Sequence, residues 1–255
     1  MMALHPAFLT QPLAHRALHD KAAGRPENSL AAMRAAIAAG YGIELDLQPS
    51  VDGVVMVFHD YSLQRLTGET GPVKGRSAAE LSKIVLSGGD TGIPTLAEVL
   101  ALVNGRTPLL IEIKDQDGAM GPDVGPLEAA AAKLLRDYAG PLAVMSFNPH
   151  SIAAFSKAAP EICVGLTTSA YHAQDWKLLP AARREALRAI PDFDALGAQF
   201  ISHEAKDLES QRVAELKARN VPVLCWTIRS LEAETQARRV ADNVTFEGYL
   251  SPLPA

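Results

Sequence analysis

IELDLQ, residues 43–48, is typical of a short buried strand, and so is the following run VVMVFHD, residues 54–60. Side chains two apart on a strand point to the same face, so Glu44 and Asp46 project together while the leucines face the other way. Two carboxylates on one face of an apolar strand repel each other and are costly to remove from water. A bound cation would offset this cost, so the pattern predicts a carboxylate metal site with His59 beside it.

Strand-like and helix-like segments alternate along the rest of the chain. Most of the strands are continuous apolar runs, which is typical of a parallel sheet covered by helices. About eight strand–helix units in 255 residues favour the α/β class and a closed (β/α)8 TIM barrel, with residues 1–255 as a single domain. The expected strands are residues 13–16, 43–48, 54–60, 108–114, 142–147, 162–168, 195–202 and 221–228, with a short extended piece at 244–246.

Helices are expected after most of these strands. The first is expected over residues 28–40, with Asn28 as its N-cap. Ser77 and Thr95 each precede a glutamate by three residues, which predicts a capping box and a helix start at both positions. Residues 61–92 form the longest interruption of the alternation between strands and helices. We therefore expect this segment to be a short excursion over the barrel mouth after the third strand.

The composition narrows the class of protein. With a net charge of −5, the chain has no excess of basic residues, so a nucleic-acid partner is not expected. No apolar run approaches the roughly 18 to 20 residues of a membrane span, and residues 1–12 make a poor signal peptide, so we expect no stable membrane insertion. Cys163 and Cys225 lie in apolar runs without a metal-binding motif, which predicts buried free thiols and a cytoplasmic location.

Polar side chains gather where four neighbouring strands are expected to end, and the functional residues of a (β/α)8 barrel lie at the carboxyl ends of its strands. Each residue alone has a plainer interpretation, such as a structural acid, an ion pair between Glu112 and Lys114, or a capping pair at His59 and Asp60. Trp226 is interpreted as a core residue or an apolar wall, and the other five histidines as surface or packing residues. The shared position predicts one site, built from His15, Arg16, Glu44, Asp46, His59, Asp60, Glu112 and Lys114.

Several motifs follow one another in a recognisable order: His15-Arg16, Pro26-Glu27-Asn28-Ser29, Ile43-Glu44-Leu45-Asp46, Asp52-Gly53, Val55 to Asp60, Leu63, Ile93-Pro94-Thr95-Leu96 and Leu110-Ile111-Glu112-Ile113-Lys114. This order resembles the glycerophosphodiester phosphodiesterase family. The resemblance is dense over residues 13–114 and thinner afterwards, where Ser146-Phe147 and Trp226-Thr227 continue it. It implies a (β/α)8 barrel that uses a divalent cation, Mg2+ or Ca2+, to hydrolyse glycerophosphodiesters to glycerol phosphate and an alcohol.

The resemblance also implies a role for individual residues. Glu44, Asp46 and Glu112 match the metal ligands, and His15 and His59 match the acid/base pair. Arg16 and Lys114 match groups near the phosphate, Glu27 matches a supporting acid, and Trp226 is expected to contact the substrate.

Besides a different loop at residues 18–25 and a mild change from Thr to Ser29, the chain has two departures from the family pattern that bear on the site. Ala17 stands where a glycine usually follows His-Arg, which bears on the geometry of the phosphate-binding loop. Near the C-terminus the family commonly shows Thr-Asp-x-Pro, whereas this chain has Thr245-Phe246-Glu247-Gly248 without the usual aspartate. The second departure bears on the identity of the leaving group.

The residue types suit phosphodiester hydrolysis. Three carboxylates offer only oxygen ligands, which suit Mg2+ or Ca2+ better than Zn2+. Histidine titrates near neutral pH, so one imidazole can accept a proton while another donates one. Three alternatives remain open on these residues: a phospholipase-like diesterase acting on lipid head groups, a barrel that binds a phosphodiester without turnover, and a metal-dependent aldolase-like barrel.

Overall fold

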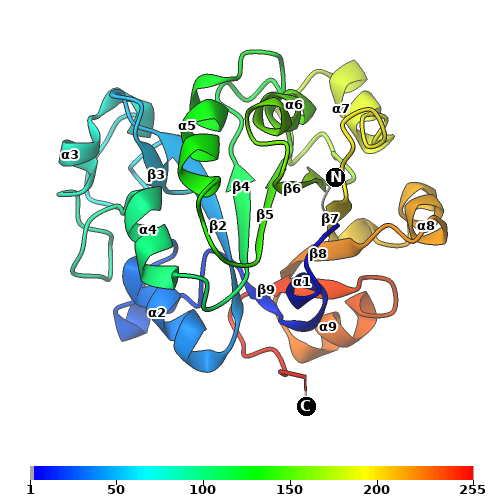
Figure 1. Cartoon of the computed structure of the whole chain (residues 1–255), viewed down its shortest axis with the longest axis horizontal. Helices are drawn as coiled ribbons and strands as arrows, with labels where there is room; N and C mark the ends of the chain where they lie inside the picture. The colour runs from blue at the N-terminus through cyan, green and yellow to red at the C-terminus, as the bar shows by residue number, and fades with distance from the viewer. Residues whose placement is uncertain (1–2, 255) are drawn as a thin grey trace.

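Eight parallel strands close into a barrel at the centre of the computed structural model, which describes residues 3–254 (Figure 1). The strands pair with one another in chain order, and the first strand pairs with both the second and the last, which closes the sheet. The predicted (β/α)8 TIM barrel is therefore confirmed. The barrel strands are β1 (Leu13–Ala14), β2 (Gly42–Pro49), β4 (Leu109–Ile113), β5 (Leu142–Ser146), β6 (Cys163–Thr168), β7 (Phe200–Glu204), β8 (Val223–Ile228) and β9 (Asn243–Phe246).

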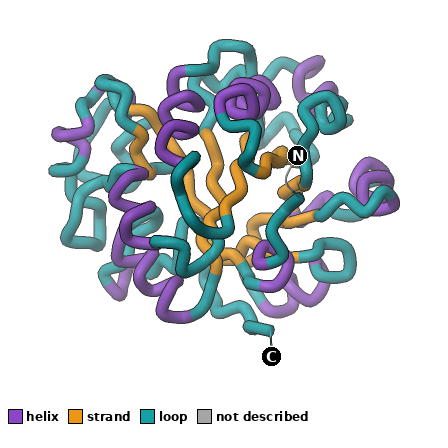
Figure 2. The backbone as a smooth tube through the Cα atoms, viewed as in Figure 1, coloured by secondary structure: helices purple, strands orange, loops and turns teal. Residues whose placement is uncertain are grey.

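Helices surround the strands on the outside of the barrel (Figures 1 and 2). The capping boxes predicted at Ser77 and Thr95 are both formed. The N-cap of the first long helix lies one residue later than predicted, because the side chain of Ser29, and not of Asn28, caps it. The helices are α1 (Ala7–Thr10), α2 (Leu30–Ala39), α3 (Ala78–Leu81), α4 (Leu96–Val103), α5 (Pro126–Leu135), α6 (Pro149–Ala158), α7 (Ala181–Arg188), α8 (Gln211–Ala218) and α9 (Leu231–Ala237), with 3-10 turns at Lys21–Ala23, Val73–Gly75 and Ala205–Asp207.

The third strand in the chain is not part of the barrel. This strand, β3 (Val55–Val57), runs antiparallel to β2 and lies on its outer side. The interpretation of residues 54–60 as a parallel barrel strand was wrong, because the tight turn around Asp52 and Gly53 sends the chain straight back along β2. The predicted excursion begins here, and it has its own small apolar cluster, formed by Met56, Phe58, Leu63, Val73, Leu81, Leu86 and Ile93.

Two later segments also differ from the sequence interpretation. The piece at 244–246 is a complete barrel strand, β9, that pairs with β8 and β1. Strand β7 begins at Phe200, five residues after the expected start, because residues 191–197 form turns. The barrel therefore keeps eight strands, since β9 takes the place that had been assigned to β3.

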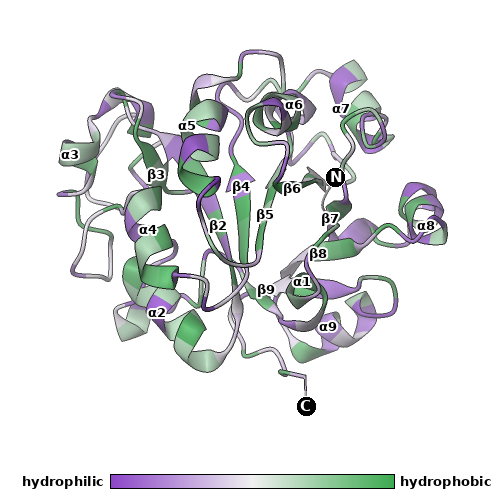
Figure 3. Ribbon diagram, in the orientation of Figure 1, coloured by the Kyte–Doolittle hydropathy of each residue, from purple (hydrophilic) through white to green (hydrophobic). Residues whose placement is uncertain are grey.

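Inward-facing side chains change from apolar to polar along the barrel axis. Figure 3 shows that the barrel strands are mainly hydrophobic, whereas the helices mix hydrophobic and hydrophilic residues. At the amino end of the strands the interior is filled by Leu13, Leu110, Cys163, Phe200 and Leu224, and Phe8 of α1 closes this end. Two residues further along their strands, His15, Glu112 and Trp226 line a cavity instead. The apolar layer at the amino end of the strands thus supports the polar side chains at the carboxyl end.

Two further expectations concern the cysteines and the membrane. Cys163 and Cys225 are buried and free, as predicted. Within residues 3–254, no helix has both the length and the apolar character needed to cross a bilayer.

Candidate active site

A cavity of about 180 Å³ opens at the carboxyl end of the barrel strands. Of the nine residues to which a role was assigned, all except Glu27 line this cavity, and Glu27 bonds to Arg16, which does. Residues far apart in the sequence meet here because the parallel strands all end on the same side. The lining is formed by His15, Arg16, Glu44, Asp46, His59, Glu112, Lys114, Met145, Phe147, Thr167, Trp226, Thr227, Arg229 and Thr245.

Glu44, Asp46 and Glu112 form a compact cluster of buried carboxylates. Asp46 and Glu112 are direct neighbours in the register of β2 and β4, and Glu44 lies two residues back on the same face of β2. One oxygen of each carboxylate lies within 4.8 Å of the others. The predicted convergence of the three acids is confirmed.

The buried position and the neighbouring carboxylates of the cluster change the pKa of Glu44. Burial, followed by the nearby carboxylates of Asp46 and Glu112, raises the pKa of Glu44 well above its usual value. Burial also opposes the charge of Asp46, but His59, Lys114 and Arg16 outweigh it and lower the pKa of Asp46. An all-oxygen cluster that carries uncompensated negative charge fits a hard divalent cation.

Lys114 and Arg16 supply positive charge on either side of this cluster. The Lys114 Nζ lies 2.6 Å from Glu112 Oε1 and 3.4 Å from Asp46 Oδ1, so the rim ion pair considered as an alternative does form, inside the site. Burial disfavours the charged ammonium, but Glu112 and Asp46 outweigh burial and raise the pKa of Lys114. The Arg16 backbone N–H donates to Glu44 Oε2 over 2.9 Å, and its Nη1 donates to Glu27 Oε1 over 2.8 Å.

His59 is held by a carboxylate partner on its own loop. Its Nδ1 lies 2.6 Å from Asp60 Oδ1. Burial opposes the charge of Asp60, but hydrogen bonds from His59 and Arg65 outweigh it and lower the pKa of Asp60. Arg65 also bonds to Glu27, so a chain of hydrogen bonds joins His59 through Asp60, Arg65 and Glu27 to Arg16. Glu27 therefore connects the two polar sides of the cavity, in addition to binding Arg16.

His15 has a carboxylate partner that the sequence interpretation did not identify. Its Nδ1 lies 2.5 Å from Glu247 Oε2, just after β9. Burial opposes the charge of Glu247, but hydrogen bonds from His15 and His19 outweigh it and lower the pKa of Glu247. His19, which was interpreted as a surface or packing residue, places Nε2 3.5 Å from the same carboxylate. Glu247 is a polar residue at the end of a barrel strand, so the rule applied to the other strands would have found it if 243–246 had been identified as one.

Asn28 is a second residue whose place in the site was not anticipated. Its backbone has a φ of 58°, in the left-handed region, and its side chain donates to Asp46 Oδ2 over 3.0 Å. The side chain expected to cap α2 orients a carboxylate of the cluster instead.

Aromatic side chains form another part of the cavity wall. The Trp226 and Phe147 rings are in edge contact, with centroids 5.4 Å apart, and the Trp226 Nε1 donates to the Ser202 carbonyl oxygen. Phe147 in turn contacts Trp176, and Lys114 Nζ lies 5.9 Å from the Phe147 centroid. Trp226 is therefore an apolar wall of the site, one of the two interpretations considered for it.

Known proteins resemble this chain in both sequence and fold. The sequence profile of the glycerophosphoryl diester phosphodiesterase family matches residues 15–244. The chain belongs to this family. A glycerophosphodiester phosphodiesterase from Caldanaerobacter subterraneus subsp. tengcongensis is 32% identical over 181 residues, which cover 65% of this chain and 70% of the relative. A putative glycerophosphodiester phosphodiesterase, YhdW, of Bacillus subtilis is 26% identical over 91% of this chain and 93% of its own.

Among solved structures, a phosphodiesterase from Oleispira antarctica in complex with the product sn-glycerol-3-phosphate superimposes with a TM-score of 0.75. It is 26% identical to this chain, and the match covers 94% of each protein. These relatives are phosphodiesterases by name, and the Oleispira antarctica structure shares the fold described above.

The two departures from the phosphodiesterase family pattern have structural counterparts. Ala17 adopts a φ of 65°, a left-handed conformation that glycine takes at lower cost, and its N–H bonds to the Glu44 carbonyl oxygen. The loop therefore keeps a left-handed turn without glycine. In the C-terminal segment that lacks the usual aspartate, Glu247 places a carboxylate against His15.

Proposed function

We propose that this chain hydrolyses glycerophosphodiesters to glycerol 3-phosphate and an alcohol. The observation that carries the proposal is the meeting, in one cavity, of three buried carboxylates and two histidines that each have a carboxylate partner. Membership of the glycerophosphoryl diester phosphodiesterase family supports the same reaction. The product in the Oleispira antarctica structure is the one that this reaction would release.

Glu44, Asp46 and Glu112 would hold a divalent cation, Mg2+ or Ca2+. When bound, such an ion supplies positive charge that polarises the phosphoryl group. Arg16 and Lys114 leave the three carboxylates with about one net negative charge, and a divalent ion would make the site net positive. The site would then attract a diester anion, although the protein as a whole carries a charge of −5.

His15 and His59 would carry the proton transfers. An ionised carboxylate only accepts hydrogen bonds, so the Nδ1 of each ring carries the proton and Nε2 is left to exchange a proton with the substrate. One imidazole would accept a proton from the attacking group, which is water or a hydroxyl of the substrate, while the other donates one to the departing alcohol. Attack by the substrate hydroxyl gives a cyclic phosphate, which water then opens to glycerol 3-phosphate. Arg16 and Lys114 would bind phosphate oxygens, and Trp226 would pack against the carbon chain of the substrate.

A substrate panel tests this proposal. Protein treated with EDTA is mixed with several glycerophosphodiesters, and the release of glycerol 3-phosphate is measured as Mg2+, Ca2+ or Mn2+ is restored. We expect no release without a cation and turnover with Mg2+ or Ca2+. Absence of release with every cation and every diester would refute the proposed reaction, and release that persists in EDTA would remove the cation from it.

A further inference from the structure

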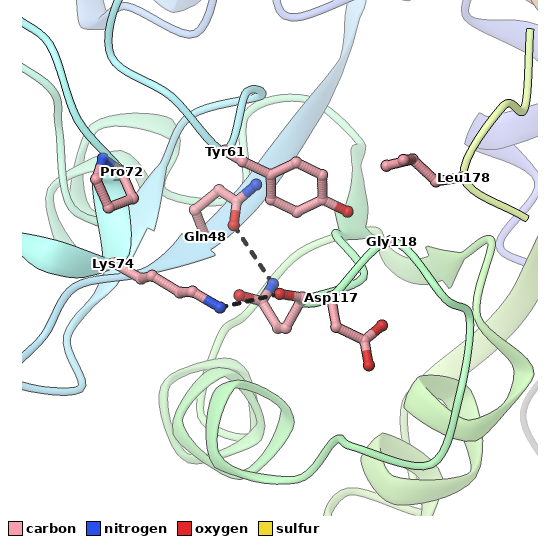
Figure 4. A pocket seen from close by; sticks show the side chains of 8 residues that line it. Gln48, Tyr61, Pro72, Lys74, Asp117, Gly118 and Leu178 are labelled. Atoms are coloured by element: carbon pink, nitrogen blue, oxygen red, sulfur yellow. Dashed lines mark hydrogen bonds between the residues drawn. The ribbon is translucent and has the colours of Figure 1, made fainter.

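A second cavity, of about 260 Å³, is lined by the residues drawn in Figure 4. It is built on three segments of chain that also contribute to the catalytic cavity. Gln48, Tyr61 and Gln116 line it, and each stands two residues after a residue of the catalytic cavity, namely Asp46, His59 and Lys114. The other lining residues are Pro72, Lys74, Asp117, Gly118 and Leu178.

Hydrogen bonds tie this second cavity to the backbone of the catalytic residues. Gln48 Nε2 donates to the His59 carbonyl oxygen over 3.2 Å. Gln116 Nε2 donates to the Lys114 carbonyl oxygen over 2.6 Å and to Gln48 Oε1 over 3.3 Å. The side chains of the second cavity are thus hydrogen-bonded to the segments that carry His59 and Lys114.

The lining combines one aromatic face with several polar groups. Tyr61 is 45% exposed and Leu178 is 80% exposed, so both offer apolar surface to an occupant. Burial, and next the charge of Asp115, raises the pKa of Tyr61 to about 12, so its hydroxyl keeps its proton at neutral pH. Gln116 Oε1 is buried and accepts no hydrogen bond from any residue between 3 and 254. A buried acceptor of this kind is costly to leave unpaired.

The charged groups that line the second cavity are of both signs. The Lys74 ammonium lies in the lining, donating to the Gln116 carbonyl oxygen over 3.1 Å, and Asp117 offsets its charge. A quaternary ammonium has no N–H or O–H, so it cannot donate a hydrogen bond to the polar groups of the lining. A hydroxyl group both donates and accepts, so it can pair with an amide oxygen, a carboxylate or an ammonium.

From this arrangement we infer that the second cavity is the subsite for the alcohol that leaves, and that it takes a hydroxyl-rich alcohol such as glycerol or an inositol. The polar groups would bind the hydroxyls, and the Tyr61 ring would pack against the carbon skeleton. This inference rests on the proposed function, because the alcohol has to come from a diester that the site cleaves.

The test compares two classes of diester in the cation-loaded protein. The specificity constant kcat/KM is measured for glycerophosphoinositol and for glycerophosphocholine. We expect the wild type to favour the inositol diester by about tenfold or more, since a site built for hydroxyls discriminates against an alcohol that lacks them. Tyr61→Ala should lower kcat/KM for the inositol diester about tenfold and change the choline diester less than about twofold. Tyr61→Phe, which keeps the ring, should retain most of the preference.

Val85→Ala is the matched control, since Val85 is on the same excursion, is 51% exposed and does not line the cavity. A wild-type preference for choline, or an equal loss on both diesters in Tyr61→Ala, would overturn the inference while the proposed hydrolysis still stands. Saturation-transfer NMR with free myo-inositol examines the cavity without turnover. We expect an inositol signal that Tyr61→Ala removes. A signal that is absent, or that does not depend on Tyr61, would refute the subsite even if every diester is cleaved.

Discussion

His15 and Glu247 lie 232 residues apart in the sequence, yet His15 Nδ1 and Glu247 Oε2 are separated by 2.5 Å. The closure of the barrel brings them together, because β1 and β9 are paired neighbours and His15 and Glu247 each follow directly on one of these strands. His59 has an equivalent partner in the next residue, Asp60. The two imidazoles are thus supported in the same chemical way, one through tertiary structure and the other through local sequence.

Removal of either imidazole tests the proposed proton transfers. His15→Ala and His59→Ala should each lower kcat by on the order of 10² to 10⁴, because general acid–base catalysis contributes about that much. Circular dichroism should show that both variants remain folded. His150→Ala, an exposed histidine on α6, is the control and should keep full activity. Wild-type turnover in folded His59→Ala would remove His59 from the mechanism.

Glu247→Gln tests whether the carboxylate acts through His15. The hydrogen bond and charge of Glu247 raise the pKa of His15, against the larger lowering effect of burial. Its loss should therefore move the limb of the pH–rate profile that His15 controls to lower pH, and kcat should fall by on the order of 10².

Glu232→Gln, an exposed acid in the first turn of α9, is the control for this measurement and should leave the profile unchanged. A lower rate with an unshifted pH profile would show that Glu247 only supports the local structure.

Cation binding should strengthen as the pH rises. Because burial and the neighbouring carboxylates raise the pKa of Glu44, the cation has to displace a proton from it at pH values where an ordinary glutamate is already ionised. Calorimetric titration with Mg2+ or Ca2+ at about pH 5.5 and about pH 8 should show tighter binding and less proton release at the higher pH.

The cation should also raise the Tm, because it binds the folded state. Glu44→Gln should weaken binding and remove its pH dependence, whereas the exposed Glu209→Gln should change neither. Affinity that is the same at both pH values in the wild type would contradict the assignment of Glu44 as a ligand.

The apolar layer at the amino end of the barrel strands is densely packed, so one extra methyl group beside it should destabilise the folded protein. A Cβ atom added at Gly165 on β6 would lie 2.6 Å from the Phe200 ring. Gly165→Ala should therefore lower the free energy of unfolding by about 1–3 kcal/mol, as overpacking of a dense core does. Urea denaturation measures this change. Gly68→Ala, where no atom lies within 4 Å of the added Cβ, should leave stability nearly unchanged.

Both cysteines should be unreactive in the folded protein. Burial raises the pKa of Cys163 and of Cys225 to about 12. A thiol reagent such as DTNB at about pH 8 should label neither residue until denaturant is added, because only the exposed thiolate reacts. Since the unfolded thiol titrates near 9.0, the neutral thiols stabilise the fold below that pH, and this contribution should be lost as the pH rises towards 12. Rapid labelling of the native protein would contradict the burial of these side chains.

Much of the site could be predicted from the sequence because its chemistry lies in short-range patterns. The spacing of Glu44 and Asp46 places both on one face of a strand whatever the strand pairs with. The apolar runs that alternate with helices indicate a parallel barrel, and a parallel barrel brings strand ends together, which is why Glu112 could be placed with Asp46.

Other features depended on long-range pairing. Residues 55–57 are as apolar as a barrel strand, and only their antiparallel pairing with β2 excluded them from the barrel. Residues 243–246 are short, and only their pairing with both β8 and β1 made them the strand that closes the barrel. Asn28 had a local signal for a helix cap, but the tertiary contact with Asp46 gave its side chain a different partner.

The sequence by itself thus determined the barrel class, the three acids and the two histidines, because the two-residue alternation along a strand is a local property. Only the tertiary structure decided which strand closes the barrel, which carboxylate supports His15, and where a second cavity adjoins the first. These features depend on pairing between segments that the chain separates by tens to hundreds of residues, and local backbone preferences do not specify that pairing.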